Sequence, residues 1–450
     1  MNKNKTCKNS PALLLARAST ELSRMSLLNP LLILVSLVIL PAESVLARIT
    51  KGPFLLRVYQ NRAALMWETD TKGNGKLLYC TDVKEKPNRI ITRPQRVQYE
   101  IRQDPNNILK KTVFIHKTWL KNLRPGQRYS YRIADSESES DFYSFRTVPA
   151  DTNEVNFIVY GDSRTNPETH RKIVEQIIKK NVDFVVHTGD LVTDGDDYDQ
   201  WGPQFFEPLR GLSESVPVYI AKGNHEGDNG NFEKLLVPPG EENNFAFDYG
   251  PVHYFCADNS AKNLDPKKLL KQIASSIQGS KAQWKFISYH IPSLNLGGHW
   301  SDWGWPEVLS VFAEAGADFV ITGHSHQYER FRPVAPPRLP LRLPVGRQAW
   351  GRGGSFVTYI TAGGGGGPLY DVTPTAYHAK AKKLYHFCLF HIRDGKITFD
   401  AIDVNGQVFD HFEITKFDGK LNKEYLETAI SAAEVQSYRD AHKPQKISLR

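Results

Sequence analysis

Short apolar runs, each ending at a turn, alternate with helix-like stretches through the middle of the chain. Pro167–Lys180 and Asp265–Ile277 carry apolar residues at the spacing of an amphipathic helix. Short apolar runs that lead into turn or polar residues are typical of buried strands. Five such runs are Asn156–Tyr160, Asp183–His187, Val216–Ile220, Trp284–Ile287 and Phe319–Ile321. This alternation predicts a layered α/β fold with polar residues on the strand ends.

The region before it, residues 48–150, has a different pattern. Short alternating segments separated by turn residues predict an all-β sandwich. They are Ala63–Trp67, Lys76–Tyr79, Lys111–Ile115, Arg128–Ile133 and Phe142–Phe145. Two roles are open for this module. It either packs against and supports the domain that follows, or it binds a glycan or a partner through exposed aromatics such as Trp119.

The C-terminal part combines a basic loop, further strands and a helix. Pro333–Gly354 is rich in Pro, Arg and Gly and predicts an extended loop that covers a site, binds a partner or is disordered. Asn422–Arg439 predicts one amphipathic helix, followed by a basic tail at Lys443–Arg450. Strands are predicted at Phe356–Thr361, Tyr385–Ile392, Lys396–Ile402 and Val408–Ile414, the last three completing a second sheet.

The N-terminus has the pattern of a secretory signal peptide. Five basic residues precede an apolar run from Leu27 to Leu40, and Val45-Leu46-Ala47 is a small-residue cleavage pattern. We predict cleavage after Ala47 and export to the periplasm or the medium. The alternative is an uncleaved anchor, but the run is interrupted by Pro30 and short for a spanning helix. No later stretch is long and apolar enough to span a membrane.

Composition narrows the possible partners. A chain of 450 residues with 40% hydrophobic and 24% charged residues is globular and large enough for two or three domains. The net charge of +8 falls to about +5 without residues 1–47, a mild excess that favours anionic substrates. No basic run interleaved with aromatics is present, so a nucleic-acid partner is not indicated. Cys80, Cys256 and Cys388 are widely spaced, which favours buried thiols over a disulfide framework.

The strongest chemical signal lies in Gly323–Arg330, directly after the last apolar run. His324 and His326 are two residues apart, so on extended backbone they share a face. Two imidazoles leaving one strand end suit a transition-metal site, although two unrelated turn histidines would look the same. The other strand ends carry more metal-competent or polar side chains: Asp162, Asp190, Asn224, His225 and His290.

The ordered set resembles the calcineurin-like metallophosphoesterases. The matching pattern is Gly-Asp-x, Gly-Asp, Gly-Asn-His-Glu, hydrophobic-x-x-His and Gly-His-x-His, and it covers roughly Asn156 to Arg330. The preceding module and the Tyr-Glu-Arg after the histidine pair resemble purple acid phosphatases. Leu123–Tyr129 resembles the tyrosine corner of fibronectin type III-like modules.

The resemblance implies an architecture. It is an α/β (α+β) four-layer metallophosphoesterase sandwich with an N-terminal all-β fibronectin type III-like sandwich. The expected parts are a signal peptide (1–47), the fibronectin type III-like domain (48–150), the catalytic domain (151–418) and a C-terminal helix with a basic tail (419–450).

The resemblance also implies a site for two metal ions, with iron, manganese or zinc as candidates. Asp190 would bridge the ions. Asp162 and His326 would complete the first site, and Asn224, His290 and His324 the second. His225 would protonate the leaving oxygen or stabilise the transition state.

Two positions depart from the family pattern. Arg164 stands where the common motif has His, and Thr193 stands where purple acid phosphatases have a metal-binding Tyr. The first site therefore lacks one expected ligand, and we expect the protein not to be purple. Arg164 either grips a substrate phosphate or pairs with an aspartate among Asp194–Asp199.

Three further residues have open roles. We expect Glu226 to orient a neighbouring group through a hydrogen bond and not to take a direct part in the chemistry. His187 lies between apolar strand residues, a pattern that favours a histidine buried in the core over a metal ligand. His299, on the loop after His290, contacts substrate or lies in an exposed turn.

The sequence therefore predicts an exported dinuclear-metal phosphoesterase, acid-phosphatase-like, that hydrolyses a small phosphorylated substrate by attack of a metal-bound hydroxide. One alternative is a phosphodiesterase or nucleotide hydrolase of the same fold. The other is a metal-depleted, non-catalytic binding protein.

Overall fold

The computed structural model describes residues 49–335 and 356–442, apart from 83, 85, 105–106, 135–138, 302 and 305–306. The predicted signal peptide and the basic tail after 442 lie outside the described residues. So does most of the Pro/Arg-rich loop, from 336 to 355.

The N-terminal β domain, residues 49–150, is a sandwich of two four-stranded sheets with the orders β1-β2-β6-β5 and β4-β3-β7-β8. Its core holds Trp67, Tyr131 and Phe145, all buried. The backbone N–H of Arg124 donates to the hydroxyl of Tyr129 at 2.9 Å, the contact that the tyrosine-corner pattern predicts. The strands are β1 (Ile49–Val58), β2 (Arg62–Thr69), β3 (Gly75–Cys80), β4 (Asn88–Thr92), β5 (Gln95–Asp104), β6 (Asn107–Lys121), β7 (Arg128–Ala134) and β8 (Tyr143–Arg146).

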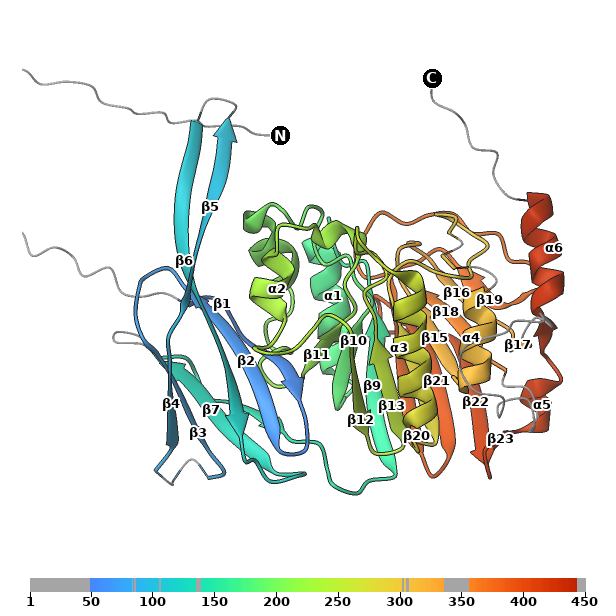
Figure 1. The fold of residues 1–450 in the computed structure, drawn as a ribbon, viewed down its shortest axis with the longest axis horizontal. Coiled ribbons are helices and arrows are strands. Elements are labelled where there is room, and N and C mark those ends of the chain that lie inside the picture. The colour runs from blue at the N-terminus through green and yellow to red at the C-terminus, as the bar shows by residue number, and fades with distance from the viewer. Residues whose placement is uncertain are drawn as a thin grey trace, which may run out of the picture. The chain divides into compact units, whose positions relative to one another are not determined.

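The α/β domain, residues 151–442, has two seven-stranded mixed sheets with helices on their outer faces (Figure 1). The first sheet has the order β11-β10-β9-β20-β21-β22-β23, and the second β12-β13-β14-β15-β18-β16-β19. Aromatic rings such as Phe157, Phe286 and Phe390 fill the space between the sheets. Helices α1 and α2 pack on the first sheet and α3 and α4 on the second. The predicted four-layer sandwich with an N-terminal β sandwich is therefore confirmed.

The strands of the α/β domain are β9 (Glu154–Tyr160), β10 (Phe184–His187), β11 (Val218–Ile220), β12 (Phe245–Tyr249), β13 (Val252–Cys256), β14 (Trp284–Ser288), β15 (Phe319–Thr322), β16 (Tyr328–Phe331), β17 (Val334–Ala335), β18 (Thr358–Ala362), β19 (His378–Lys382), β20 (His386–Arg393), β21 (Lys396–Asp403), β22 (Val408–Phe417), β23 (Lys420–Leu421) and β24 (Ile430–Ser431). The helices are α1 (Pro167–Ile178), α2 (Asn231–Leu236), α3 (Pro266–Gly279), α4 (Glu307–Ala315), α5 (Lys423–Leu426) and α6 (Ala432–His442).

Two details near the C-terminus differ from the sequence expectation. The predicted strands at Tyr385–Ile392, Lys396–Ile402 and Val408–Ile414 do not complete the second sheet, because β20 pairs with β9 and places them in the first.

The single helix expected over Asn422–Arg439 is instead α5, the short strand β24 and α6. Ser431 accepts from the N–H of Ala433, and Glu434 reaches back to the N–H of Ser431, a capping arrangement that starts a new helix at this point.

The two domains share an apolar and polar contact. Lys117 donates to the carbonyls of Glu233 and Val237, and the indole N–H of Trp119 donates to the carbonyl of Pro239. Trp119 therefore packs against the α/β domain, which favours the supporting role over glycan binding through this ring. Arg57 pairs with Glu241 at 3.0 Å across the same contact.

Two smaller expectations concern cysteines and membrane spans. Cys80, Cys256 and Cys388 are buried free thiols. Within the described residues, no helix is long and apolar enough to cross a membrane.

Candidate metal centre

Five strands from both sheets carry the predicted ligands just beyond their carboxyl ends. Asp162 follows β9, Asp190 follows β10 and Asn224 follows β11, three neighbouring parallel strands of the first sheet. His290 follows β14, and His324 and His326 follow β15, in the second sheet. Since the carboxyl ends of parallel strands meet at one edge, the six side chains come together.

The first ligand group consists of Asp162, Asp190 and His326, all buried, with one donor atom from each within 4.8 Å of the others. Nε2 of His326 lies 3.3 Å from Oδ1 of Asp162. Nδ1 of His326 donates to the carbonyl of Pro368 at 2.8 Å, so Nε2 keeps its lone pair. That Nε2 is buried and has no hydrogen-bond partner among the described residues.

The second ligand group consists of Asp190, Asn224, His290 and His324. Nε2 of His290 lies 3.1 Å from Oδ1 of Asp190 and 3.3 Å from Nδ1 of His324. That same Nδ1 is 3.0 Å from Oδ1 of Asn224. Nδ1 of His290 donates to the carbonyl of Thr188 at 2.8 Å, which again leaves Nε2 as an electron-pair donor.

Both groups fit a divalent or trivalent cation. In each group the oxygen and imidazole donor atoms face one another. His290 and His326 have fixed tautomers, and the lone pair on Nε2 of each ring faces the other donor atoms. Such atoms repel unless a cation or a proton lies between them. Burial opposes charge on His290, yet Asp190, Asp162 and Glu226 raise the pKa of His290 to about 9. These carboxylates thus stabilise a positive charge at or beside His290.

The backbone around the ligands is tightly constrained. Asp162, Asp190 and His324 adopt positive φ values of 58°, 57° and 66°, which cost energy in residues other than glycine and are typical of functional sites. A Cβ at Gly223 would lie 2.4 Å from Oδ1 of Asp190, and one at Gly323 would lie 2.5 Å from Oδ2 of Asp162. Gly223 directly precedes Asn224, and Gly323 directly precedes His324. A side chain at either position would collide with a ligand carboxylate, so glycine is required there.

Glu226 acts on the backbone of the site. It is buried, and its carboxylate accepts from the N–H groups of Asp190, Leu191 and Gly223 at 3.0, 2.7 and 2.6 Å. Burial and the nearby Asp190 raise its pKa, while the amide donors oppose that shift. These contacts agree with the orienting role expected for Glu226.

His225 lies beside the ligand groups without belonging to either of them. Its Nδ1 donates to the carbonyl of Thr193 at 2.6 Å, and Nε2 lies 3.8 Å from Oδ2 of Asp190. The imidazole is therefore held in one tautomer with Nε2 turned toward the centre. The side chain is 31% exposed, so a ligand from solvent can reach the imidazole.

Arg164 also turns toward the centre. Its Nε donates to Oδ2 of Asp190 at 3.3 Å, and Nη1 donates to the hydroxyl of Thr165 at 3.3 Å. The expected alternative of a pair with an aspartate among Asp194–Asp199 is wrong, because the carboxylate beside Arg164 is Asp190. A guanidinium thus lies next to the first ligand group, at the position where the family motif has an imidazole.

Thr193, the second departure from the family pattern, helps to build this corner. Its amide and hydroxyl both donate to Oε1 of Gln204, at 2.9 and 3.0 Å, and the amide of Thr165 donates to the same atom at 3.0 Å. Thr165 is β-branched with a φ of 75°, a strained conformation that this hydrogen bond supports. Gln204 therefore ties the segment after Asp162 to the segment after Asp190.

The loop Ser293–Ser301 brings His299 to the mouth of the site. The His299 ring lies 4.3 Å from that of His324, and its backbone N–H donates to the hydroxyl of Ser325 at 3.1 Å. His299 is exposed beside the second ligand group. His187, in contrast, is buried and lies 3.0 Å from the hydroxyl of Ser163, as expected for a core histidine.

A buried arginine holds this loop from outside. Nη1 of Arg439, on α6, donates to the carbonyl of Ser293 at 3.2 Å, and Nη2 donates to that of Ser301 at 2.8 Å. Its guanidinium also lies 5.1 Å from the Trp300 ring. The C-terminal helix therefore fixes both ends of the loop that carries His299.

Several residues of the site were not predicted from the sequence. Tyr370 stacks on His326 with ring centroids 4.6 Å apart, and Gln204 and Arg439 act through partners 11 to 146 residues away along the chain. The glycine-rich segment Ala362–Gly367 passes close to the same ligand. A Cβ at Gly367 would lie 2.6 Å from the His326 ring, so glycine allows this close backbone approach.

Comparisons with known families agree with this geometry. Residues 155–328 match the calcineurin-like phosphoesterases, and residues 56–147 match the N-terminal domain of purple acid phosphatases.

Among curated proteins, purple acid phosphatase 21 of Arabidopsis thaliana is 26% identical over 257 residues, 52% of this chain and 57% of the relative. "Probable inactive purple acid phosphatase 1" of the same plant is 22% identical over 365 residues, 69% of this chain and 57% of the relative. The chain spans about half the length of the curated relatives it matches.

Solved structures show the same fold. The purple acid phosphatase PPD1 of yellow lupin (Lupinus luteus) superposes with a TM-score of 0.63 at 17% identity, covering 82% of this chain and 74% of that one. PhoD superposes with a TM-score of 0.56 at 11% identity, covering 83% and 91%.

Proposed function

Because the chain belongs to the calcineurin-like phosphoesterases and carries the N-terminal domain of purple acid phosphatases, we propose that it is an exported phosphoesterase. It would hydrolyse small phosphate monoesters with two metal ions, iron, manganese or zinc. The observation that carries this proposal is the convergence of six donor side chains on one edge, including the buried, unpartnered Nε2 of His326.

The two ligand groups would each hold one ion, with Asp190 shared between them. Bound there, the ions would neutralise the anionic ester and lower the pKa of a coordinated water so that it can attack phosphorus at neutral pH. The chain's own work is to present these donors in fixed orientations. The Thr188 and Pro368 carbonyls hold His290 and His326, and Glu226 holds the backbone of Asp190.

His225 is the proposed proton donor. The Thr193 carbonyl takes its Nδ1–H, so Nε2 is the atom that faces the centre and can deliver a proton to the leaving oxygen.

Arg164 is the proposed phosphate-binding residue. Nε and Nη1 are engaged with Asp190 and Thr165, while Nη2 has no partner among the described residues. A guanidinium so placed can bind a phosphoryl oxygen beside the first ligand group. The side chain is 13% exposed, which keeps it preorganised but reachable.

A non-catalytic metal binder is the second candidate. Arg164 and Thr193 supply neither the imidazole nor the phenol of the family pattern, so among the residues that the structure describes the first ligand group has three side chains. Some relatives are themselves named probable inactive purple acid phosphatases. A diesterase or nucleotide hydrolase with the same centre is a further alternative.

One assay separates these possibilities. A chromogenic phosphomonoester and the matching diester are offered to the wild type and to Asp190→Asn and His225→Ala variants, with manganese, zinc or iron added. Metal-dependent monoesterase activity that collapses in both variants supports the proposal. Diesterase activity alone supports the alternative enzyme. A wild type that binds metal and is silent with both esters contradicts catalysis and supports the binder.

A further inference from the structure

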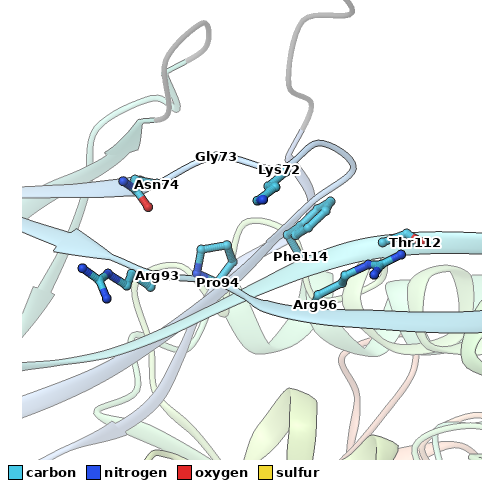
Figure 2. A pocket seen from close by; sticks show the side chains of 8 residues that line it. All are labelled: Lys72, Gly73, Asn74, Arg93, Pro94, Arg96, Thr112 and Phe114. Carbon is cyan, nitrogen blue, oxygen red and sulfur yellow. The ribbon is translucent and has the colours of Figure 1, made fainter.

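A cleft in the N-terminal β domain, distant in sequence from the metal ligands, has the features of a binding site. It has a volume of about 820 Å³, within the range of ligand pockets. Its walls come from the loop between β2 and β3, the connection from β4 to β5, and strands β5 and β6 (Figure 2). The lining residues are Lys72, Gly73, Asn74, Arg93, Pro94, Arg96, Thr112 and Phe114. We call this site the basic cleft.

Every charged side chain that lines the basic cleft is positive. Lys72, Arg93 and Arg96 are exposed, and none of them makes a side-chain hydrogen bond or ion pair with any residue the structure describes. Figure 2 shows them around the Pro94 ring, with Arg93 and Arg96 on either side of it. Three cations in one hollow repel one another and attract an anion.

The charge of the whole chain is concentrated in the same domain. Residues 49–150 hold 19 Lys or Arg against 10 Asp or Glu, a net charge of +9. Residues 151–450 hold 32 against 37, a net charge of −5. A positive N-terminal domain on a negative α/β domain is an asymmetry that indicates an anionic partner for the N-terminal domain.

The basic cleft opens on the sheet face that is turned away from the α/β domain. Val97, Val113 and Ile115 form one apolar cluster with Phe205 of the α/β domain. Side chains alternate between the two faces of a strand, so Arg96 and Phe114, which are cross-strand partners, lie on the opposite face. A ligand in the cleft would therefore not reach the metal ligands.

The uncharged residues that line the cleft indicate which class of polyanion fits it. Asn74 and Thr112 can hydrogen-bond to hydroxyls, and Pro94 offers apolar surface to C–H groups. An inorganic polyphosphate presents neither hydroxyls nor C–H groups. Phe114 is only 9% exposed, so it offers little ring face on which a nucleic-acid base could stack. A hollow suits a polymer segment better than it suits the plane of a bilayer.

We propose that the basic cleft binds an acidic polysaccharide, with its carboxylate or sulfate groups held by Lys72, Arg93 and Arg96. Guanidinium groups bind such oxyanions in bidentate fashion. The site would tether the protein to an anionic glycan while leaving the metal centre open to small substrates. This inference is independent of the proposed function.

The test measures binding of the full chain to five probes by calorimetry at two salt concentrations. The probes are a heparin-type sulfated oligosaccharide, a galacturonate oligomer, neutral dextran, polyphosphate and a single-stranded oligonucleotide. We expect binding to one or both acidic oligosaccharides that weakens with salt, and none to dextran. The double variant Arg93→Ala/Arg96→Ala should bind about tenfold more weakly or worse.

The matched control is Lys121→Ala/Arg124→Ala, which removes two exposed charges from the same domain outside the cleft. It should bind as the wild type does, and both double variants should hydrolyse a small phosphate ester at the wild-type rate. Lys72→Ala provides an independent check on the cleft. Equal losses in both double variants, tighter binding of the oligonucleotide or polyphosphate, or no binding of either acidic glycan would each overturn the proposal.

Discussion

The two ligand groups share Asp190 but differ in what surrounds them. The second group has four side chains, and Nδ1 of His324 lies close to both Asn224 and His290. The first has three side chains, and the Arg164 guanidinium lies against its shared carboxylate. The Arg164 guanidinium already balances part of the negative charge of Asp190, so the first group attracts a metal ion less strongly. We therefore expect the second group to bind its ion more tightly.

The largest effect should come from Asp190, the residue common to both groups. Asp190→Asn removes the shared carboxylate, and we expect it to lower metal content and reduce kcat/KM by about 10³-fold or more, since several kcal/mol of charge stabilisation are lost. Elemental analysis alongside the ester assay checks both. Asp248→Asn, an exposed carboxylate of the same domain, is the control. Two ions retained in Asp190→Asn would show that Asp190 is not shared.

Loss of His225 should separate chemistry from metal binding. His225→Ala should leave the ion count unchanged and lower kcat by about 10² to 10⁴-fold, because the proton donor is gone. Esters with acidic leaving groups need little proton donation, so they should lose less than alkyl esters. His411→Ala, an exposed histidine, should behave as the wild type. An equal loss for both ester types would argue against proton donation.

Substitution of Arg164 tests the difference between the two ligand groups most directly. Arg164→Ala should raise KM by about 10- to 100-fold, the worth of one hydrogen bond to a charged group. Arg164→His should restore an imidazole to the first group and tighten its ion, read from a metal titration. Arg171→Ala on α1 is the matched control, since the one side-chain hydrogen bond of this cation within the described part of the chain goes to the carbonyl of Glu207. An unchanged KM in Arg164→Ala would remove this residue from substrate binding.

A smaller effect should come from the clamp on the His299 loop. Arg439→Ala leaves the buried carbonyls of Ser293 and Ser301 without these donors, and we expect a loss of about 1–3 kcal/mol in unfolding free energy. Hydrogen exchange should rise in the loop 293–301, and Arg439→Lys should rescue part of both changes. Unaltered exchange in the loop would mean that α6 does not hold it.

The last effect concerns the pH dependence of stability and lies outside both groups. Burial lowers the pKa of His170 to about 4, from an ordinary value near 6.5. The unfolded chain therefore takes up this proton first as pH falls. Stability from the neutral His170 is full above pH 6.5 and should be lost toward pH 4 at up to about 1.4 kcal/mol per pH unit. Urea unfolding of wild type and His170→Gln between pH 4.5 and 7.5 should show a flatter profile for the variant; parallel profiles would contradict the assignment.

The strand ends were predictable because local pattern encodes them. An apolar run followed by glycine and aspartate describes Asp162 and Asp190, an apolar run followed by polar residues describes His290, and strand ends of parallel sheets meet at one edge. The four-layer fold followed from the same pattern together with the family resemblance.

Contacts across long stretches of chain were not predictable. Arg164 meets a carboxylate 26 residues away, and Trp119 meets the carbonyl of Pro239 at the domain contact, so their partners depend on tertiary packing. The break between α5 and α6 did have a local signal, Ser431 followed three residues later by Glu434, which the amphipathic pattern obscured.

The most direct test of two unequal ligand groups is a manganese titration of the metal-free protein. Native mass spectrometry counts the bound ions while a chromogenic phosphomonoester reports activity in the same samples. We predict two ions per chain bound in separate steps, with hydrolysis rising as the second ion binds. Activity that is complete with one ion, or its absence with two ions bound, would contradict this account.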